Sequence, residues 1–128
     1  MKSYVFDTNI LLRYFLEDLE IHYAKAVEVV REIEDEKAIG RLSIVVVAET
    51  IWTFGSVYKL NRNIILEQLL QLIALKNMRI IETKKNILME VLKKMIKNKF
   101  DFVDNYLSEI ASKKEIFSFD KDFEKLFR

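Results

Sequence analysis

Five acidic residues stand where a folded chain could bring carboxylates together. Asp7 and Asp120 each follow a short apolar run, and Asp101 and Asp104 begin an expected helix. Glu49 lies in an otherwise apolar stretch, where an unpaired carboxylate is costly to bury. Four carboxylates held close together do not all stay ionised without a cation. Oxygen ligands of this kind are what Mg²⁺ and Mn²⁺ prefer, so the acids indicate a candidate site for such an ion.

Each acid also has an ordinary structural explanation. Asp7 could cap a turn, and Asp101, Asp104 and Asp120 could be first-turn charges that favour the helix dipole. Glu49 could lie on the solvated side of its helix. No acid decides the question alone, so these alternatives stay open until the residues are placed in space.

The composition narrows the classes of protein and site. The 128 residues, 51% of them hydrophobic, fit a single domain over residues 1–128. With one histidine and no cysteine, the chain is poorly suited to an ordinary zinc site and has no cysteine nucleophile. The net charge of +1 means that any RNA contact must be a local patch. We expect a soluble, cytoplasmic protein, because neither a signal peptide nor a membrane-spanning run is visible.

The apolar pattern predicts an alternation of strands and helices. Strands are expected at residues 3–6, 39–42, 78–81 and 116–119. Helices are expected at residues 10–16, 21–37, 43–58, 63–75, from 83 to about 97, 102–113 and 120–127. The expected N-caps are Asn9, Ser43 and Thr83, and the helix over 102–113 is expected to start at Asp101 or Phe102. This alternation predicts a parallel sheet with helices on both faces and a site beyond the carboxyl ends of its strands.

Four segments, in this order, resemble the motifs of PIN domains. The segment YVFDTNILLRYF resembles the first PIN motif, in which a strand is followed by Asp-Thr-Asn and an apolar helix. The segment LSIVVVAETIW resembles the second motif, in which an acid lies in a helix that follows a short strand and a serine. The segments FDFVDNYLSEIA and IFSFDKDFEKL resemble the third and the fourth PIN motif, in this order. The order and spacing agree over nearly the full length, and the subgroup that the chain resembles most is the VapC-like toxin ribonucleases.

The resemblance implies a three-layer α/β/α fold, with a short, mostly parallel central sheet of four to five strands flanked by helices. It implies that Asp7, Glu49, Asp104 and Asp120 form the metal-binding acidic site, with Asp7 and Asp104 as the most direct ligands. The family pattern assigns supporting places to Thr8, Asn9 and Ser118, and a weaker one to Asp101. The chain departs from that pattern at Asn105-Tyr106, where small apolar residues are frequent, and at Ser118, where threonine is commoner.

The resemblance also implies an activity and partners. The activity is Mg²⁺-dependent endonucleolytic hydrolysis of RNA, with Mn²⁺ able to replace Mg²⁺. A water on the metal would attack the phosphate in line, and no covalent enzyme intermediate is needed. The implied partners are an RNA substrate, a VapB-type antitoxin that masks the acidic cleft, and a second copy in a homodimer.

Three basic side chains are candidates for RNA contact, namely Arg13, Lys97 and Lys99. Arg13 lies close to the Asp-Thr-Asn motif and could touch RNA, or it could pair with Glu17 one helical turn away. The lysines belong to a basic run that forms either a solvated helix face or a phosphate-binding margin beside the acids.

Other classes of function stay open. A PIN-like RNA-binding or scaffold module without turnover, or a PIN nuclease of RNA processing, would carry the same fold. A receiver-type phosphoacceptor also places acids at strand ends, but it needs an acidic pair after the first strand and a lysine after the last. This chain has Asp7-Thr8-Asn9 at the first place and only Lys121 near the second.

Overall fold

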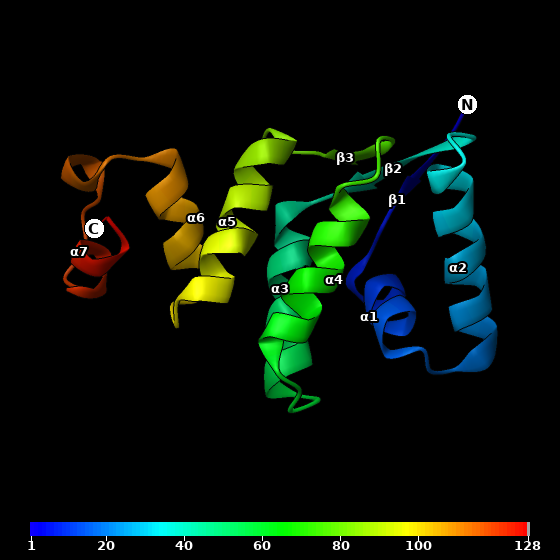
Figure 1. Ribbon diagram of the computed structural model, residues 1–128, viewed down its shortest axis with the longest axis horizontal. Coiled ribbons are helices and arrows are strands. Elements are labelled where there is room, and N and C mark those ends of the chain that lie inside the picture. The colour runs from blue at the N-terminus through cyan, green and yellow to red at the C-terminus, as the bar shows by residue number, and fades with distance from the viewer. Residues whose placement is uncertain (128) are drawn as a thin grey trace.

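The computed structural model describes residues 1–127 and arranges them in an elongated body of three parallel strands and seven α-helices (Figure 1). The strands are β1 (Lys2–Val5), β2 (Ala38–Leu42) and β3 (Met78–Ile80), hydrogen-bonded in the order β1-β2-β3. The helices are α1 (Thr8–Leu16), α2 (Glu20–Glu34), α3 (Ile44–Ser56), α4 (Arg62–Ile73), α5 (Lys85–Lys97), α6 (Phe102–Ile110) and α7 (Asp122–Leu126), with a 3₁₀ turn, η1 (Lys113–Glu115), before α7. No helix of the described chain is long and apolar enough to cross a membrane.

Both helix pairs that connect the strands lie on one face of the sheet. Crossovers between parallel strands are right-handed, so two successive crossovers in one direction place α1–α2 and α3–α4 on the same side. This covered face carries Ala38, Gly40 and Leu42 of β2, all of them buried. Gly40 lies directly against Ile33 of α2 and against Met78 of β3. The close approach of α2 to β2 therefore depends on the missing side chain of Gly40.

The opposite face of the sheet is open in the part of the chain that the structure describes. Val5 is 64% exposed, and its cross-strand neighbours Arg41 and Arg79 are exposed too. Residues 1–127 therefore form two layers at the sheet, a covered face and an open one, where we expected three layers.

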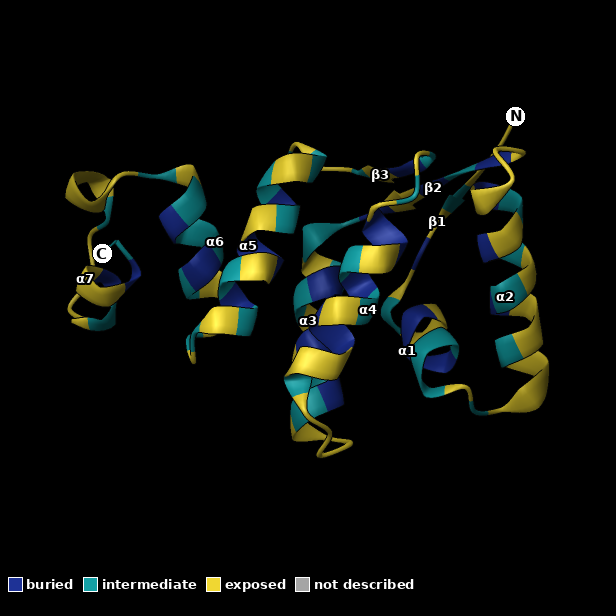
Figure 2. Ribbon diagram, viewed as in Figure 1, coloured by how far each residue is buried: buried dark blue, intermediate teal, exposed yellow. Residues whose placement is uncertain are grey.

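The hydrophobic core lies between the covered face of the sheet and helices α1 to α5. Figure 2 shows buried positions concentrated where these helices face one another. Apolar residues three or four apart give each helix one buried stripe. The largest fully buried side chains are Leu11, Ile33, Leu42, Val47, Ile65, Leu66, Leu69, Ile73, Met78, Leu88, Leu92 and Met95. Each of them stabilises the fold by about 1.5–3 kcal/mol relative to exposure.

One of the three predicted helix caps, Ser43, is confirmed, and Asp101, expected at the start of its helix, is a cap as well. The Ser43 hydroxyl caps α3 and the Asp101 carboxylate caps α6. The prediction of Asn9 at the start of α1 is wrong, because the helix begins two residues earlier and Asp7 caps it. Thr83 does not cap α5 either, since the chain becomes helical only two residues later and that helix has no side-chain cap.

The predicted strand at residues 116–119 is not formed, so the expectation of four to five strands is wrong and the described sheet has three. The segment starts in extended backbone, with Ile116 at φ −78° and ψ 117°, and bends at Phe119. Its location explains the difference, because it lies between α6 and α7 at the end of the molecule opposite β1 (Figure 1). No strand of the described chain is beside it, and a strand needs a neighbour for its backbone hydrogen bonds.

Candidate functional site

Polar side chains follow all three strands at the carboxyl edge of the sheet, where sites form in parallel sheets. Asp7 comes two residues after β1, Ser43 comes directly after β2, and Glu82 comes two residues after β3. Ser43 donates a hydrogen bond to Glu82, whose Oε1 also accepts from the Ile44 amide at 2.9 Å. The start of α3 is thus tied to the chain beyond β3, and this fixes the helix that carries Glu49.

Glu82 is a site-positioning residue that the sequence interpretation missed. Burial opposes its ionisation, but hydrogen bonds from the Ser43 hydroxyl and from backbone amides lower the pKa of the Glu82 carboxyl. The signal that could have found it is the same as for Asp7, namely an acid at the end of a predicted strand.

Asp7 is exposed at the end of β1, and its Oδ1 accepts a hydrogen bond from the Ile10 amide at 2.8 Å. The bond caps α1, so the ordinary structural explanation of Asp7 is confirmed. Its second carboxylate oxygen makes no hydrogen bond within residues 1–127. Asp7 therefore serves as a cap and still has an oxygen for a ligand. The supporting roles of Thr8 and Asn9 stay predictions.

Glu49 is exposed on α3 and lines a groove between α3 and α6. The groove has a volume of about 460 Å³, and Asp101 lies on its other wall beside Phe102. Trp52, one helical turn beyond Glu49, lines the same groove and is 65% exposed. The fold thus brings one acid of the second motif and one of the third motif to the same groove.

A second group of acids lies around the first turn of α6. Asp101 accepts a hydrogen bond from the Asp104 amide at 2.9 Å, which is the N-cap of the helix. Partial burial raises the pKa of the Asp104 carboxyl above its ordinary value. The charge and side-chain hydrogen bond of Asp101 raise it further, followed by the charges of Asp120 and Asp122. Carboxylates from two separate motifs are therefore close enough to repel one another here.

Ser118 and Asp120 form a local turn. The Ser118 hydroxyl accepts a hydrogen bond from the Asp120 amide at 3.0 Å, and Asp120 Oδ1 accepts from the Asp122 amide at 2.9 Å. Ser118 therefore holds the backbone of Asp120, and its supporting role at a metal site stays a prediction.

Within one chain, the four predicted acids are distributed over separate places. Glu49 shares a groove with Asp101, Asp104 lies near Asp120, and Asp7 lies at the end of β1. Residues 1–127 contain no group of three His, Cys, Asp or Glu side chains arranged to hold a metal ion. The donor chemistry, carboxylate oxygens only, suits a hard cation such as Mg²⁺.

The loop between α5 and α6 is held by two side chains that span it. Arg62 donates to the carbonyl oxygens of Phe100, Met95 and Asn98 at 2.7, 2.9 and 2.7 Å. Asn105 is fully buried and donates to the carbonyls of Phe100 and Asp101 at 3.2 and 2.8 Å. The departure from the family pattern at Asn105 thus has a role in the structure, since it fixes the loop that leads into Asp101.

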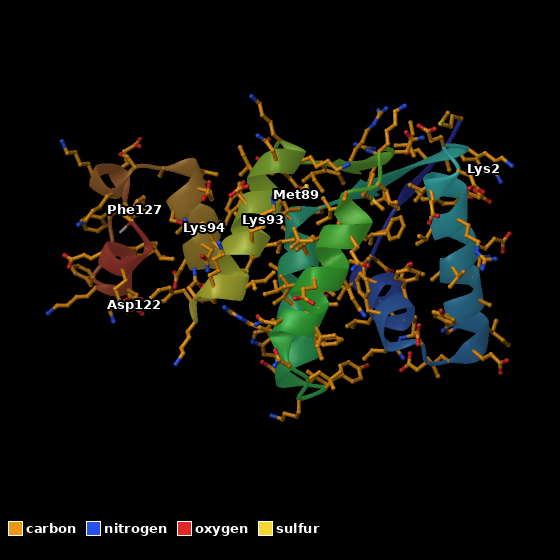
Figure 3. The ribbon with its side chains drawn as sticks, viewed as in Figure 1. Lys2, Met89, Lys93, Lys94, Asp122 and Phe127 are labelled. Atoms are coloured by element: carbon orange, nitrogen blue, oxygen red, sulfur yellow. The ribbon has the colours of Figure 1, made fainter. Side chains whose placement is uncertain are left out.

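The basic candidates have different environments. Arg13 is buried and donates to Asp18 at 3.0 Å and to the Tyr58 hydroxyl at 2.7 Å, so its partner is not Glu17. Figure 3 shows Lys93 and Lys94 on α5, and Lys94 bonds Ser108 of α6 at 2.6 Å. Lys97 and Lys99 are exposed beside the start of α6. Of the three predicted RNA contacts, these two lysines therefore have accessible ammonium groups.

Comparison with known proteins adds one finding. A family model described as the PIN domain matches residues 4–127. Neither the curated proteins nor the solved structures include a match to the chain. The matched segment contains β1 from Tyr4 onward and every acid discussed above, and PIN domains are generally nucleases. Because the model covers almost the whole sequence, the chain belongs to the PIN-domain family.

Proposed function

We propose that this PIN-domain protein is a metal-dependent endoribonuclease that uses Mg²⁺, with Mn²⁺ able to replace it. The observation that carries the proposal is the family match over residues 4–127. The acids add support, because they occupy a strand end, a groove wall and a helix start, and they supply only oxygen ligands. The reaction class is hydrolysis of an RNA phosphodiester bond.

We further propose that Asp7, Glu49, Asp104 and Asp120 hold the metal. When bound, Mg²⁺ supplies charge neutralisation at the phosphate and acidifies a water molecule. The raised pKa of Asp104 supports this assignment, because a cation would relieve the repulsion from Asp101 and its other acidic neighbours.

Other residues of the chain position these acids or attract RNA. Ser118 holds the backbone of Asp120, and Asp101 fixes the helix start that carries Asp104. Thr8 and Asn9 orient Asp7 in this proposal. Lys97 and Lys99 form a positive margin for phosphate groups. Their contribution should weaken as the salt concentration rises.

The biological role that we propose is that of a VapC-like toxin. In this role the protein works in the cytoplasm, cleaves cellular RNA, and is inhibited by a VapB-type antitoxin covering the acidic residues. The four motifs, in VapC-like order, support this role. Induction of the wild-type chain should stop bacterial growth, and induction of Asp104→Asn should not. Normal growth with an active nuclease would favour a PIN nuclease of RNA processing.

A non-catalytic PIN-like RNA-binding or scaffold module is the second candidate. The observation in its favour is that residues 1–127 of one chain hold no group of three potential metal ligands. Such a module would bind RNA without cleaving it, with or without a divalent ion.

Cleavage of an end-labelled, random-sequence single-stranded RNA separates the two candidates. The wild type should cleave this RNA in the presence of Mg²⁺, and EDTA should abolish the cleavage. Replacing a residue that hydrogen-bonds to a metal ligand typically lowers activity about 10–100-fold, so replacing a ligand itself should lower the cleavage rate at least about a hundredfold. The variants are Asp7→Asn, Glu49→Gln, Asp104→Asn and Asp120→Asn, with the exposed Glu28→Gln of α2 as the matched control. Folded wild-type protein that binds this RNA and leaves it intact in Mg²⁺ would favour the scaffold.

A further inference from the structure

Trp52 is the only tryptophan of the chain, and it lies open to solvent on the α3 wall of the groove between α3 and α6. The residue is 65% exposed, although an indole ring has a large apolar surface that folding usually buries. Val103, on the α6 wall, is 57% exposed as well. Apolar surface therefore faces solvent from both walls of one groove, which is typical of a site that a ligand covers.

Gly55 leaves the groove open beside the Trp52 ring. It lies in the last turn of α3 and lines the groove, and a Cβ added there would meet no atom within 4 Å. Neither close packing nor a positive φ requires glycine at this position. Glycine nevertheless makes a helix less stable than alanine does. What the missing side chain preserves is the open space next to Trp52.

The groove also has carboxylates, and these restrict what can occupy it. Glu49 and Asp101 both line it, one on each wall. An apolar protein side chain placed here would remove water from these acids without replacing the lost hydrogen bonds, which is costly. A nucleobase has an apolar face for an aromatic ring and amino groups at its edge that donate to carboxylate oxygens. The volume of about 460 Å³ is in the range of small-ligand sites.

Cations lie beside the groove, where the phosphates of a bound nucleotide would emerge. Arg62 lines the groove and donates to the carbonyl oxygens of Asn98 and Phe100 at 2.7 Å each. These bonds fix the segment that carries Lys97 and Lys99 next to the groove, and both lysines are exposed. An aromatic platform with cations at its margin is the combination that binds single-stranded nucleic acid.

We propose that Trp52 is a stacking platform for one unpaired nucleobase of single-stranded RNA, and that Gly55 keeps the space which this base occupies. The ligand class rests on the proposed function, because Glu49, one helical turn from Trp52, is a proposed metal ligand. A base inside a duplex has neighbours on both faces, so only an unpaired base can stack on the ring. Every base has a π face, so the platform selects unpaired RNA and not a particular sequence.

Tryptophan fluorescence tests the stacking without any activity assay. Emission of the wild type reports on this site alone, because Trp52 is the only tryptophan. A uridine oligomer of about ten nucleotides, titrated with Ca²⁺ in place of Mg²⁺ and checked by gel for intact length, should quench the emission saturably. An abasic oligomer of the same length and charge should leave it unchanged, as should a duplex RNA. No quenching by the single strand, or equal quenching by all three, overturns the proposal.

Affinity measured on the same oligomer, labelled with fluorescein, tests the ring itself. Trp52→Ala should weaken binding by about 5–150-fold, the range found for loss of one base–aromatic stack. Trp52→Phe should retain most of the affinity, because it keeps an aromatic face. The matched control is Ile21→Ala on α2, an exposed apolar residue outside the groove, which should stay within about twofold. Wild-type affinity in a folded Trp52→Ala variant overturns the proposal.

Gly55→Leu separates a role in binding from a role in folding. Its side chain has room in the groove, and leucine favours a helix over glycine, so Tm should stay the same or rise. RNA affinity should fall at least about fivefold, because the side chain takes the place of the base. Unchanged affinity overturns the role of the open space. A lowered Tm overturns it too, since it would show that packing requires glycine.

A second copy of the chain is the competing occupant of the groove. If protein–protein contact covered Trp52, its emission would shift to the blue as the protein concentration rises, without RNA. This result would overturn the proposal, which predicts an unchanged emission maximum.

The outcomes for the platform and for the proposed function are distinguishable. Saturable quenching by single-stranded RNA that the wild type does not cleave in Mg²⁺ would keep the platform and reject the nuclease. Cleavage without quenching, at an equal rate in Trp52→Ala, would keep the nuclease and reject the platform.

Discussion

Asn105 offers the sharpest test of how the loop before α6 is held. Its side chain is fully buried and takes part in four hydrogen-bond contacts. It donates to the Phe100 and Asp101 carbonyls at 3.2 and 2.8 Å and to Asn98 Oδ1 at 3.2 Å, and it accepts from Asn98 Nδ2 at 2.7 Å. The change Asn105→Ala removes all of these hydrogen bonds and leaves Arg62 as the remaining clamp of the loop that leads to Asp101.

The size of the expected stability loss depends on which hydrogen bonds the partners of Asn105 retain after the change. The Nδ2 group has two hydrogens, so its three acceptors share two donated bonds, and with the one accepted bond this makes three bonds that would contribute about 1.5–4.5 kcal/mol at a net 0.5–1.5 kcal/mol each. The Phe100 carbonyl keeps Arg62, the Asp101 carbonyl keeps a backbone amide, and Asn98 Oδ1 keeps the Phe100 amide. Only Asn98 Nδ2 loses its partner, and Asn98 is half-buried, so water can reach it. We therefore expect the free energy of unfolding to fall by an amount in the lower half of the range, about 1.5–3 kcal/mol.

Urea and thermal unfolding followed by circular dichroism measure this loss. For a chain of this size about 3 kcal/mol lowers Tm by roughly 10 °C. The matched control is Asn86→Ala on α5, an exposed asparagine, which should change stability by less than about 0.5 kcal/mol. A loss below about 1 kcal/mol for Asn105→Ala, or one equal to the control, would refute the clamp.

Three further predictions concern the sheet and the acids. Gly40→Ala should lower the free energy of unfolding by about 1–2 kcal/mol in urea titrations, because its Cβ would come within 2.8 Å of the Met78 side chain. Burial opposes ionisation of Glu82, but hydrogen bonds led by Ser43 lower its pKa. That ionised form stabilises the protein above the ordinary pKa, and its contribution is lost as pH falls through the lowered value. Glu82→Gln should thus weaken the protein at neutral pH and flatten its loss of stability in acid. Burial and then neighbouring acids raise the pKa of Asp104, so ionisation of Asp104 lowers stability as the pH rises from the ordinary pKa to the raised one, and the full cost is present above the raised value. Asp104→Asn should therefore melt higher than the wild type at neutral pH in EDTA, and the difference should vanish in acid.

Local pattern was sufficient to predict most elements of the fold. The three strands and the helices between them follow from apolar periodicity, with ends shifted by a few residues. Ser43 and Asp101 were predictable as caps because a short polar side chain precedes an apolar run. These features depend on neighbours in sequence, which a single chain displays directly.

Features that depend on distant partners were not predictable from the pattern. Residues 116–119 have strand propensity, but a strand also needs a neighbour, and none lies beside them in the described chain. Arg13 pairs with Asp18 and Tyr58 because the α1–α2 turn and the end of α3 meet there. Asn105 bonds a loop whose course the sequence does not reveal.

The candidate site was predictable in composition but not in assembly. The motifs identified the acids, and the fold places Glu49 with Asp101 and Asp104 near Asp120. That all four of them share one cation stays a prediction. The sequence did not lead us to predict a role for Glu82, because this residue lies outside the motifs, although it follows a strand as Asp7 does.

Calorimetric titration with Mn²⁺ tests the central claim most directly, namely that carboxylates from separate motifs share one divalent cation. The wild type should bind Mn²⁺, and Asp7→Asn and Asp104→Asn should each abolish that binding while leaving the circular dichroism spectrum unchanged. Mn²⁺ binding with undiminished affinity in both folded variants, or no binding by the wild type, would contradict the claim.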